Sequence, residues 1–197
     1  MFTYSLCAAG CGRPAFTGST LCAAHSADPE ADAKKLGQHM TQKKMVKNIS
    51  AQGLLFKDMD FSNYQFYGCN FSGASFSKCL FTGAVMRMTF LDFCILSYNN
   101  FSSGDYQFLS LAGAIIQDCT FEGSELVNVN FNGTIITDSI FNKTNLYSSR
   151  FISARITRSN FIDCNLNRTI FVDSIQKDIS FKSSNTAEAI FEMEEYS

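Results

Sequence analysis

The chain has 197 residues, a formal net charge of −2 and 46% hydrophobic residues, with 20 Phe and no Trp. This length allows one medium-sized domain with a small appendage. No run of about 18 apolar residues occurs, so we expect no membrane-spanning helix, and the small charge gives no reason to expect direct nucleic-acid binding. Cysteines occupy the N-terminal region where a signal peptide would have an apolar core, which favours a cytoplasmic protein.

Residues 1–27 contain a cluster of soft metal ligands. Cys7, Cys11, Cys22 and His25 follow the spacing Cys-x3-Cys-x10-Cys-x2-His. Three thiolates and one imidazole suit tetrahedral Zn²⁺, and four protein ligands would leave no open position for catalysis. We therefore expect a structural zinc knuckle or ribbon whose folding depends on the metal and whose core is separate from the rest of the chain. Iron is a rival metal, and reduced cysteines in an unstructured N-terminus are the alternative.

Residues 28–50 are expected to form a basic linker that is at least partly helical. Asp28 can cap the N-terminus of a helix, and Pro29 suits its first position. The linker contains five lysines: Lys34, Lys35, Lys43, Lys44 and Lys47. The simpler interpretation is a solvated helix. Contact with an acidic partner or a nucleic acid is the alternative, although no aromatic residues alternate with the lysines as in single-strand binders.

The remainder of the chain repeats every five residues. From Phe56 to Phe191, every fifth residue is large and apolar or aromatic, except Gln176 and Thr186. A period of five matches neither the helical period of about 3.6 nor the strand period of about 2, and so indicates a repeat architecture. The residue two positions earlier is nearly always small. Both of these positions are expected to point inward, and the other three outward.

Five cysteines lie at the small inward position: Cys69, Cys79, Cys94, Cys119 and Cys164. No two of them are twenty residues apart, so they are not expected to stack or to form disulfides. They are interpreted as small buried hydrophobic residues in a reducing compartment.

This pattern resembles the pentapeptide-repeat family over about residues 52–191. The resemblance implies an all-β fold, a right-handed quadrilateral parallel β-helix with four pentapeptides per coil. The sequence supports a twenty-residue coil, because Phe recurs at this spacing in one column: Phe61, Phe81, Phe101, Phe121, Phe141, Phe161 and Phe181. We expect about seven coils over residues 51–191, followed by an acidic tail over residues 192–197.

Few residues are suited to catalysis. The chain has two His, and one of them is better placed as a metal ligand. An outward column of Asp118, Asp138, Arg158 and Asp178 could imitate a carboxylate pair, but no inserted loops interrupt the repeat to form a cleft beside it. We therefore expect a protein that is not an enzyme, a rigid scaffold that binds an unknown protein partner.

The family resemblance implies an alternative function. Some pentapeptide-repeat proteins resemble a DNA duplex and bind DNA gyrase or a related topoisomerase, which requires strongly acidic faces. Residues 51–197 carry ten Lys and Arg against fifteen Asp and Glu, a net charge of −5, and several arginines cluster together: Arg150, Arg155, Arg158 and Arg168. This is weak mimicry, so the scaffold is the preferred interpretation.

Two surfaces are candidates for protein contact. One column of outward positions carries Ile95, Ile115, Ile135 and Ile175, where solvent would favour polar residues. The stripe is interpreted as a partner or self-association surface, or as β-branched residues that stabilise the stack. Aromatic and apolar residues also occupy outward positions between residues 86 and 108: Met88, Phe90, Phe93, Tyr98 and Phe108. They are interpreted as partly shielded by the linker or by each other, and a partner surface is the alternative.

The second candidate surface is the C-terminal end of the rod. No further repeat follows Phe191, so the last coil is expected to expose unpaired strand edges. The expected contact residues are Ile152, Ile170, Val172, Phe181, Ile190 and Phe191. A two-fold contact through this end would cover it and produce a homodimer. The alternative is a short tail that folds back over the end.

Overall fold

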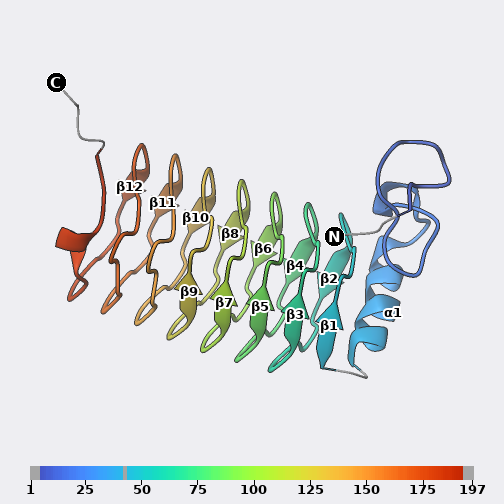
Figure 1. Ribbon diagram of the computed structural model, residues 1–197, viewed down its shortest axis with the longest axis horizontal. Helices are drawn as coiled ribbons and strands as arrows, with labels where there is room; N and C mark the ends of the chain where they lie inside the picture. The colour runs from blue at the N-terminus through green and yellow to red at the C-terminus, as the bar shows by residue number, and fades with distance from the viewer. Residues whose placement is uncertain (1–4, 42–43, 193–197) are drawn as a thin grey trace.

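The computed structural model describes residues 5–41 and 44–192, and shows a rod of stacked coils with a helix packed across its N-terminal end (Figure 1). Strands pair in parallel with partners twenty residues on, as in Leu55↔Ser75. Bridges such as Ser50↔Asn70 and Asp60↔Leu80 repeat the same spacing on the other sides. The rod is therefore a four-sided parallel β-helix of about seven coils, which confirms the predicted fold.

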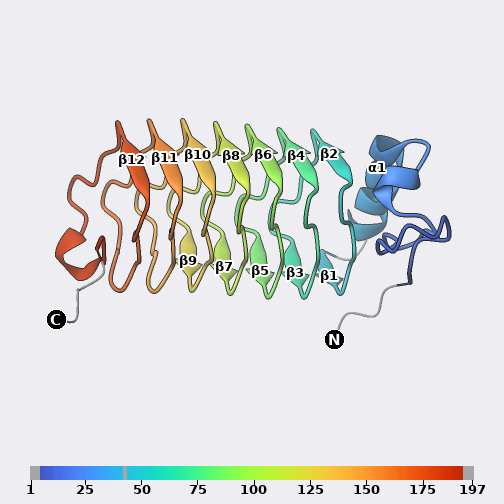
Figure 2. The same ribbon diagram turned by 90° about the horizontal axis from the view of Figure 1, so that it is seen from above.

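Two parallel sheets cover opposite sides of the rod (Figure 2). The five-stranded face consists of β1 (Met45–Lys47), β3 (Gln65–Tyr67), β5 (Val85–Arg87), β7 (Asp105–Gln107) and β9 (Glu125–Val127). The seven-stranded face consists of β2 (Leu55–Lys57), β4 (Ser75–Ser77), β6 (Ile95–Ser97), β8 (Ile115–Gln117), β10 (Ile135–Thr137), β11 (Arg155–Thr157) and β12 (Ile175–Lys177). The helical elements are η1 (Ala23–His25), α1 (Pro29–Thr41) and η2 (Thr186–Glu188).

Stacked side chains fill the interior of the rod. The rings of Phe121 and Phe141 stack 4.7 Å apart, and those of Phe131 and Phe151 stack 4.5 Å apart. Rings from opposite sides of the coil meet edge to face, as those of Phe131 and Phe141 do at 5.9 Å. The two stacking distances are close to the spacing of adjacent strands, so each coil adds one buried ring to its column.

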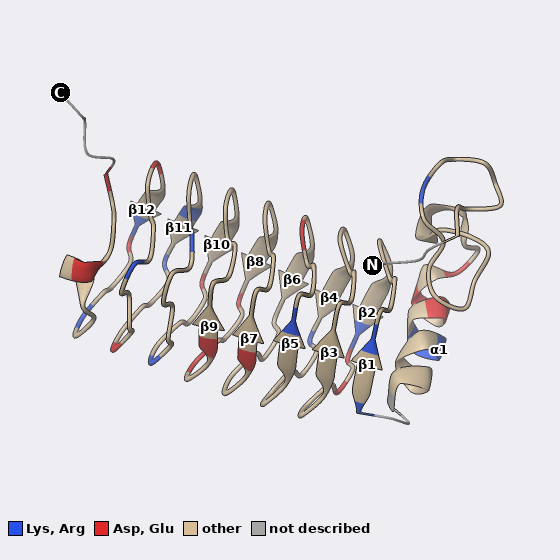
Figure 3. Ribbon diagram, viewed as in Figure 1, with Lys and Arg blue, Asp and Glu red and all other residues tan. Residues whose placement is uncertain are grey.

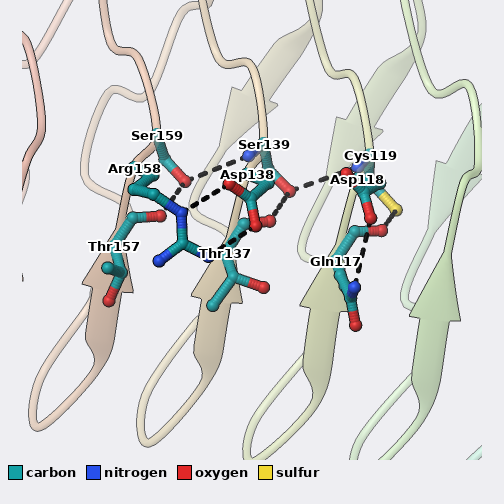
Figure 4. Close-up of polar contacts among 9 residues, drawn as sticks. All are labelled: Gln117, Asp118, Cys119, Thr137, Asp138, Ser139, Thr157, Arg158 and Ser159. Atoms are coloured by element: carbon teal, nitrogen blue, oxygen red, sulfur yellow. Dashed lines mark hydrogen bonds and ion pairs between the residues drawn. The ribbon is translucent and has the colours of Figure 1, made fainter.

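The small inward position also carries hydrogen bonds between coils (Figure 4). The hydroxyl of Ser139 accepts the backbone N–H of Cys119 at 3.2 Å and donates to the carbonyl of Thr137 at 2.8 Å. The hydroxyl of Ser159 repeats this arrangement one coil further on, accepting the N–H of Ser139 at 3.1 Å. A small side chain with a hydroxyl therefore fits the narrow interior and satisfies buried backbone groups there.

Two buried polar side chains depart from the simple pattern. Asn99, in the small column, accepts the N–H of Cys79 at 2.8 Å and donates to the carbonyl of Phe76 at 2.9 Å. Tyr106, in the large column, is fully buried and its hydroxyl reaches the carbonyls of Phe81 and Phe101 at 3.0 and 3.1 Å. Each buried group has the partners that offset its loss of hydration.

The N-terminal end of the rod begins earlier than residue 51. Strand β1 (Met45–Lys47) lies in the segment expected to be linker, yet it pairs with β3 in full register. The predicted helix is present as α1 (Pro29–Thr41), and Asp28 caps it by accepting the N–H of Ala31 at 2.9 Å. The linker is thus divided between a helix and the first coil.

The C-terminal end differs from the expectation at one position. Val172 was placed on the exposed surface, but only 7% of it is accessible. Ile152 lies one coil before Val172, and the last coil lies on the other side of Val172. The last coil is joined to the one before it by the N–H of Phe171, which donates to the carbonyl of Ile190 at 2.7 Å. Of the acidic tail expected over residues 192–197, only Glu192 lies within the described residues.

Gly104 provides a test of the interior packing. A Cβ built on Gly104 would lie 2.1 Å from the ring and hydroxyl of Tyr106. Gly104→Ala should therefore lower the free energy of unfolding by about 1–3 kcal/mol through overpacking, measured by urea denaturation. Gly104→Ala combined with Tyr106→Leu should recover much of the loss, because Ser124 and Leu126 fill the same positions one coil further on. Equal losses in the single and double variants would contradict this packing.

Candidate metal centre

The N-terminal loop brings four metal ligands together. The N–H of Cys7 donates to the carbonyl of Arg13 at 2.9 Å, which closes the loop that carries Cys11. The second half of the site follows from η1 (Ala23–His25), where the N–H of His25 donates to the carbonyl of Cys22 at 3.0 Å. This short helical turn places the His25 ring beside the thiol of Cys22.

The distances between the ligand atoms suit a tetrahedral ion. The Nδ1 atom of His25 lies 3.5 Å from the sulfurs of both Cys7 and Cys22, and the sulfurs of Cys11 and Cys22 are 3.7 Å apart. All four ligand atoms lie within 4.8 Å of one another. Zinc bond lengths predict about 3.5 Å between a sulfur and a nitrogen, and about 3.8 Å between two sulfurs, across the edges of a tetrahedron. These residues therefore fit the zinc site predicted from their spacing.

The site also favours a thiolate. The backbone N–H of Cys22, which donates to the sulfur of Cys7 at 3.3 Å, is the main cause that lowers the pKa of Cys7 to about 6. The cysteines inside the rod behave in the opposite way. Burial raises the pKa of Cys69, Cys79 and Cys119 to about 11. The chain thus has cysteines suited to binding a metal near its N-terminus and less reactive thiols in its core.

The metal centre belongs to a cap on the first coil. The N–H of Thr17 donates to the carbonyl of Ser50 at 2.7 Å, and the N–H of Ser50 donates to the hydroxyl of Thr17 at 2.9 Å. Ser50 lies at the first edge of its side of the rod, where no earlier coil could pair with it. These contacts satisfy an edge that would otherwise be open.

The core of the metal module is continuous with that of the rod, which corrects the expectation of a separate core. Phe16 and Ala23 from the module, and Leu36 and Met40 from α1, belong to the same buried cluster as Phe56 and the inward columns. The expectation was wrong because a β-helix leaves its terminal coil open, and aperiodic residues must cover it. The apolar residue Phe16 between Cys11 and Cys22 was the signal in the sequence.

The candidate interaction stripe is exposed as its register predicts. Ile95, Ile115, Ile135 and Ile175 lie in one column of the seven-stranded face, with 51%, 42%, 44% and 60% of each residue accessible. Four of the outward aromatic and apolar residues are also exposed: Met88, Phe93, Tyr98 and Phe108. Phe90 is only half-buried. The structure brings Phe93, Ile95 and Tyr98 to one level of the seven-stranded face and its two edges.

The residues expected at the C-terminal surface fall into three groups. Ile190 is 45% accessible, so it offers an apolar side chain to solvent. Phe181 and Phe191 are partly buried against the core, and Ile152 and Ile170 are half-buried. Val172 is buried and contributes nothing to this surface.

The outward acid column does not form a free carboxylate pair (Figure 4). Arg158 donates two hydrogen bonds of 2.7 Å to Asp138, from Nε to Oδ1 and from Nη2 to Oδ2. This hydrogen bonding and the guanidinium charge lower the pKa of the Asp138 carboxyl below its usual range. Asp138 is therefore ionised at neutral pH and bound to Arg158, which suits a structural ion pair.

Charges of both signs are scattered along the rod (Figure 3). On the five-stranded face, Asp105 pairs with Arg87, and Glu125 accepts a hydrogen bond from Asn145 at 2.7 Å. Lys143 pairs with Glu122 at 3.5 Å. Within the described residues, the acids are thus interrupted by bases and do not form one continuous acidic face.

Two family profiles match the sequence, and both describe this repeat. The profile for the pentapeptide repeat region matches residues 114–191, and the profile for pentapeptide repeats in eight copies matches residues 52–83 and 60–97. The chain belongs to the pentapeptide-repeat family. Proteins of this family are generally structural or interaction proteins. No curated protein matches the chain in sequence.

Several solved structures are similar to this chain. HetL, a pentapeptide repeat protein involved in heterocyst differentiation regulation from the cyanobacterium Nostoc sp. strain PCC 7120, is 12% identical with a TM-score of 0.41, over 80% of this chain and 95% of HetL. A trypsin-treated variant of QnrB1, a plasmid-mediated fluoroquinolone resistance protein, is 16% identical with a TM-score of 0.35, over 72% of this chain and 91% of QnrB1. Rfr23 from the cyanobacterium Cyanothece 51142 is 10% identical with a TM-score of 0.28, over 80% and 99% of the two chains.

The metal centre makes a direct prediction. Purified protein should contain about one Zn²⁺ per chain by elemental analysis, because four ligands complete a tetrahedral site. Cys11→Ser should lose most of this zinc. The matched control is Cys94→Ser, which changes a fully buried cysteine of the rod and should retain all of it. Full zinc content in the Cys11→Ser variant would contradict the assignment.

Proposed function

We propose that this protein is a non-enzymatic scaffold in the cytoplasm that binds a protein partner through its seven-stranded face and uses Zn²⁺ as a structural ion. The observation that supports this function is the exposed apolar column on that face. Leu55, Ile95, Ile115, Ile135 and Ile175 are each at least 42% accessible. Within the part of the chain that the structure describes, no helix has the length and apolar character needed to cross a membrane.

The five-stranded side shows that the fold does not require this apolar column. The equivalent positions there are mostly polar: Gln65, Val85, Asp105, Glu125, Asn145, Asn165 and Asn185. Their amides bond along the stack, as Asn165 Nδ2 does to Asn145 Oδ1 at 2.9 Å. A polar column therefore stacks well in the same rod, and the isoleucines support a contact with another protein.

The proposal of a non-enzymatic role is supported by one of the two clefts next to the metal module; the other is lined in part by Asp32 and His39. An open cleft of about 360 Å³ lies between the module and the first coil, lined by residues that include Arg13, Pro14, Cys22 and Leu55. Its lining residues include neither His nor a carboxylate that could transfer protons. Four protein ligands would also saturate the bound zinc and limit it to a structural role.

The C-terminal end is proposed as a second contact, which would join two copies into a homodimer. Phe181 and Phe191 are only partly buried there, and Ile190 is exposed beside them. Packing against a second copy would remove this apolar surface from water. Ile152 and Ile170 would lie at the edge of such a contact.

Binding of DNA gyrase or a related topoisomerase is the alternative function. It would require acidic faces that imitate a DNA duplex, and the alternation of Asp138 with Arg158, and of Asp105 with Arg87, opposes this. We therefore expect the purified protein to leave gyrase supercoiling unchanged. Inhibition of supercoiling, or protection of gyrase from a quinolone, would favour the alternative.

Site-specific photocrosslinking tests the proposed binding face. A photoreactive amino acid replaces Ile95 on the seven-stranded face or, as the matched control, Asn145 at the equivalent position of the other side. We expect the probe at position 95 to capture a defined protein from the native cells, at least several-fold more efficiently than the probe at position 145. Equal capture from both positions would contradict a specific binding face.

A further inference from the structure

We propose that the seven-stranded face binds a second copy of this chain, with the two rods antiparallel and related by a two-fold axis that passes through Ile115 parallel to the strands. This inference deepens the proposed interaction role of that face by naming a partner. Such an axis reverses the direction of the stack but keeps every column of side chains opposite itself. The pattern along each column therefore decides whether two copies fit.

The outward column of this face has the required symmetry. In stack order it reads Leu55, Ser75, Ile95, Ile115, Ile135, Arg155 and Ile175. About Ile115 the order is apolar, polar, apolar, apolar, apolar, polar, apolar in both directions. The axis places Ile95 opposite Ile135, Ile115 opposite itself, and Ser75 opposite Arg155. Apolar side chains thus meet apolar ones, and polar meet polar.

Along the edge of the face that precedes each strand, one position carries a protruding aromatic ring and another leaves room for such a ring. Phe93 is 71% accessible, and a Cβ on Gly113 would lie 2.6 Å from its ring, so the ring leans over Gly113 toward the axis. The axis places Phe93 opposite Gly133 of the second copy. A Cβ on Gly133 would meet nothing within 4 Å, so this corner is open. Each Phe93 ring would therefore pack against Gly133 of the other rod.

The opposite edge completes the contact and limits its strength. Tyr98, 57% accessible, lies opposite Asp138, both of whose carboxylate oxygens already accept hydrogen bonds from Arg158. Like charges also face each other on this rim, since Asp118 lies opposite itself and Lys78 lies opposite Arg158. Because salt screens these repulsions and leaves the apolar centre intact, the dimer should dissociate less at high ionic strength.

Light scattering and sedimentation of the full, zinc-loaded chain test the proposal. We expect Ile115→Asn and Gly133→Asn each to remove this contact and turn the dimer into a monomer. If the C-terminal ends also pair, the two contacts together would build an open chain of rods, and each variant should reduce it to a dimer joined by those ends. Asparagine suits both positions, because Asn145 occupies the equivalent of Ile115, and Ser153 and Asp173 adopt the φ of +56° in the Gly133 column. Gly123→Asn is the matched control. Gly123 lies on another edge of the rod, in a column where Asn63 already adopts the same positive φ, so this variant should keep the mass of the wild type.

A wild-type monomer at micromolar concentration would overturn the proposal, as would a mass unchanged by Ile115→Asn. These outcomes are distinct from failure of the proposed function. A monomer whose position 95 still captures another protein would leave the scaffold role standing, and a dimer without such capture would support self-association alone.

Thiol crosslinking tests the register. With a short bis-maleimide, Ile115→Cys should link to itself in the dimer, and the linked peptide is identified by mass spectrometry. Ile95→Cys alone should link poorly, whereas a mixture of the Ile95→Cys and Ile135→Cys proteins should link efficiently. Cys11 is the exposed native cysteine among the described residues, and zinc should protect it from the reagent. Efficient linkage of Ile95→Cys to itself would contradict the antiparallel arrangement.

Discussion

The backbone contact between successive coils is the constraint on which the rest of the structure depends. The N–H of Phe121 donates to the carbonyl of Ile140 at 2.7 Å, and the N–H of Asn145 donates to the carbonyl of Ser124 at 3.0 Å. Because such contacts link residues about twenty apart, equivalent side chains of successive coils stack in columns, and one side chain of the wrong size affects the coils on both sides. The same contact leaves open hydrogen-bonding groups at both ends of the rod.

The N-terminal cap answers this constraint with residues outside the repeat. Thr17 pairs with the free edge at Ser50, while Phe16 and helix α1 (Pro29–Thr41) cover the open interior. A segment of this length has too small a core to hold itself in place. The Cys7 site would hold the loop that presents Phe16 and Thr17, so the metal centre and the stability of the first coil are linked through the cap.

The sequence predicted the periodic part of the molecule well, and the reason is physical. A fixed repeat imposes one environment on each position, so the inward Phe61 column and the exposure of Ile115 follow from register alone. The cluster of three cysteines and one histidine could also be predicted, because tetrahedral coordination limits residue type and spacing. Packing at the ends does not repeat, so neither the contact of Phe16 with the rod nor the burial of Val172 followed from periodicity. Asn99 broke the small column, and only the structure shows its hydrogen-bond partners.

Hydrogen–deuterium exchange, with and without zinc, tests most directly the claim that a bound metal holds the cap that closes the first coil. Removal of zinc by a chelator should speed exchange in peptides that cover residues 44–70, where Ser50 and β1 (Met45–Lys47) adjoin the cap. Peptides from residues 101–171 should exchange as slowly as before, because their coils keep both neighbours. Unchanged exchange in residues 44–70 after complete loss of zinc would contradict the account.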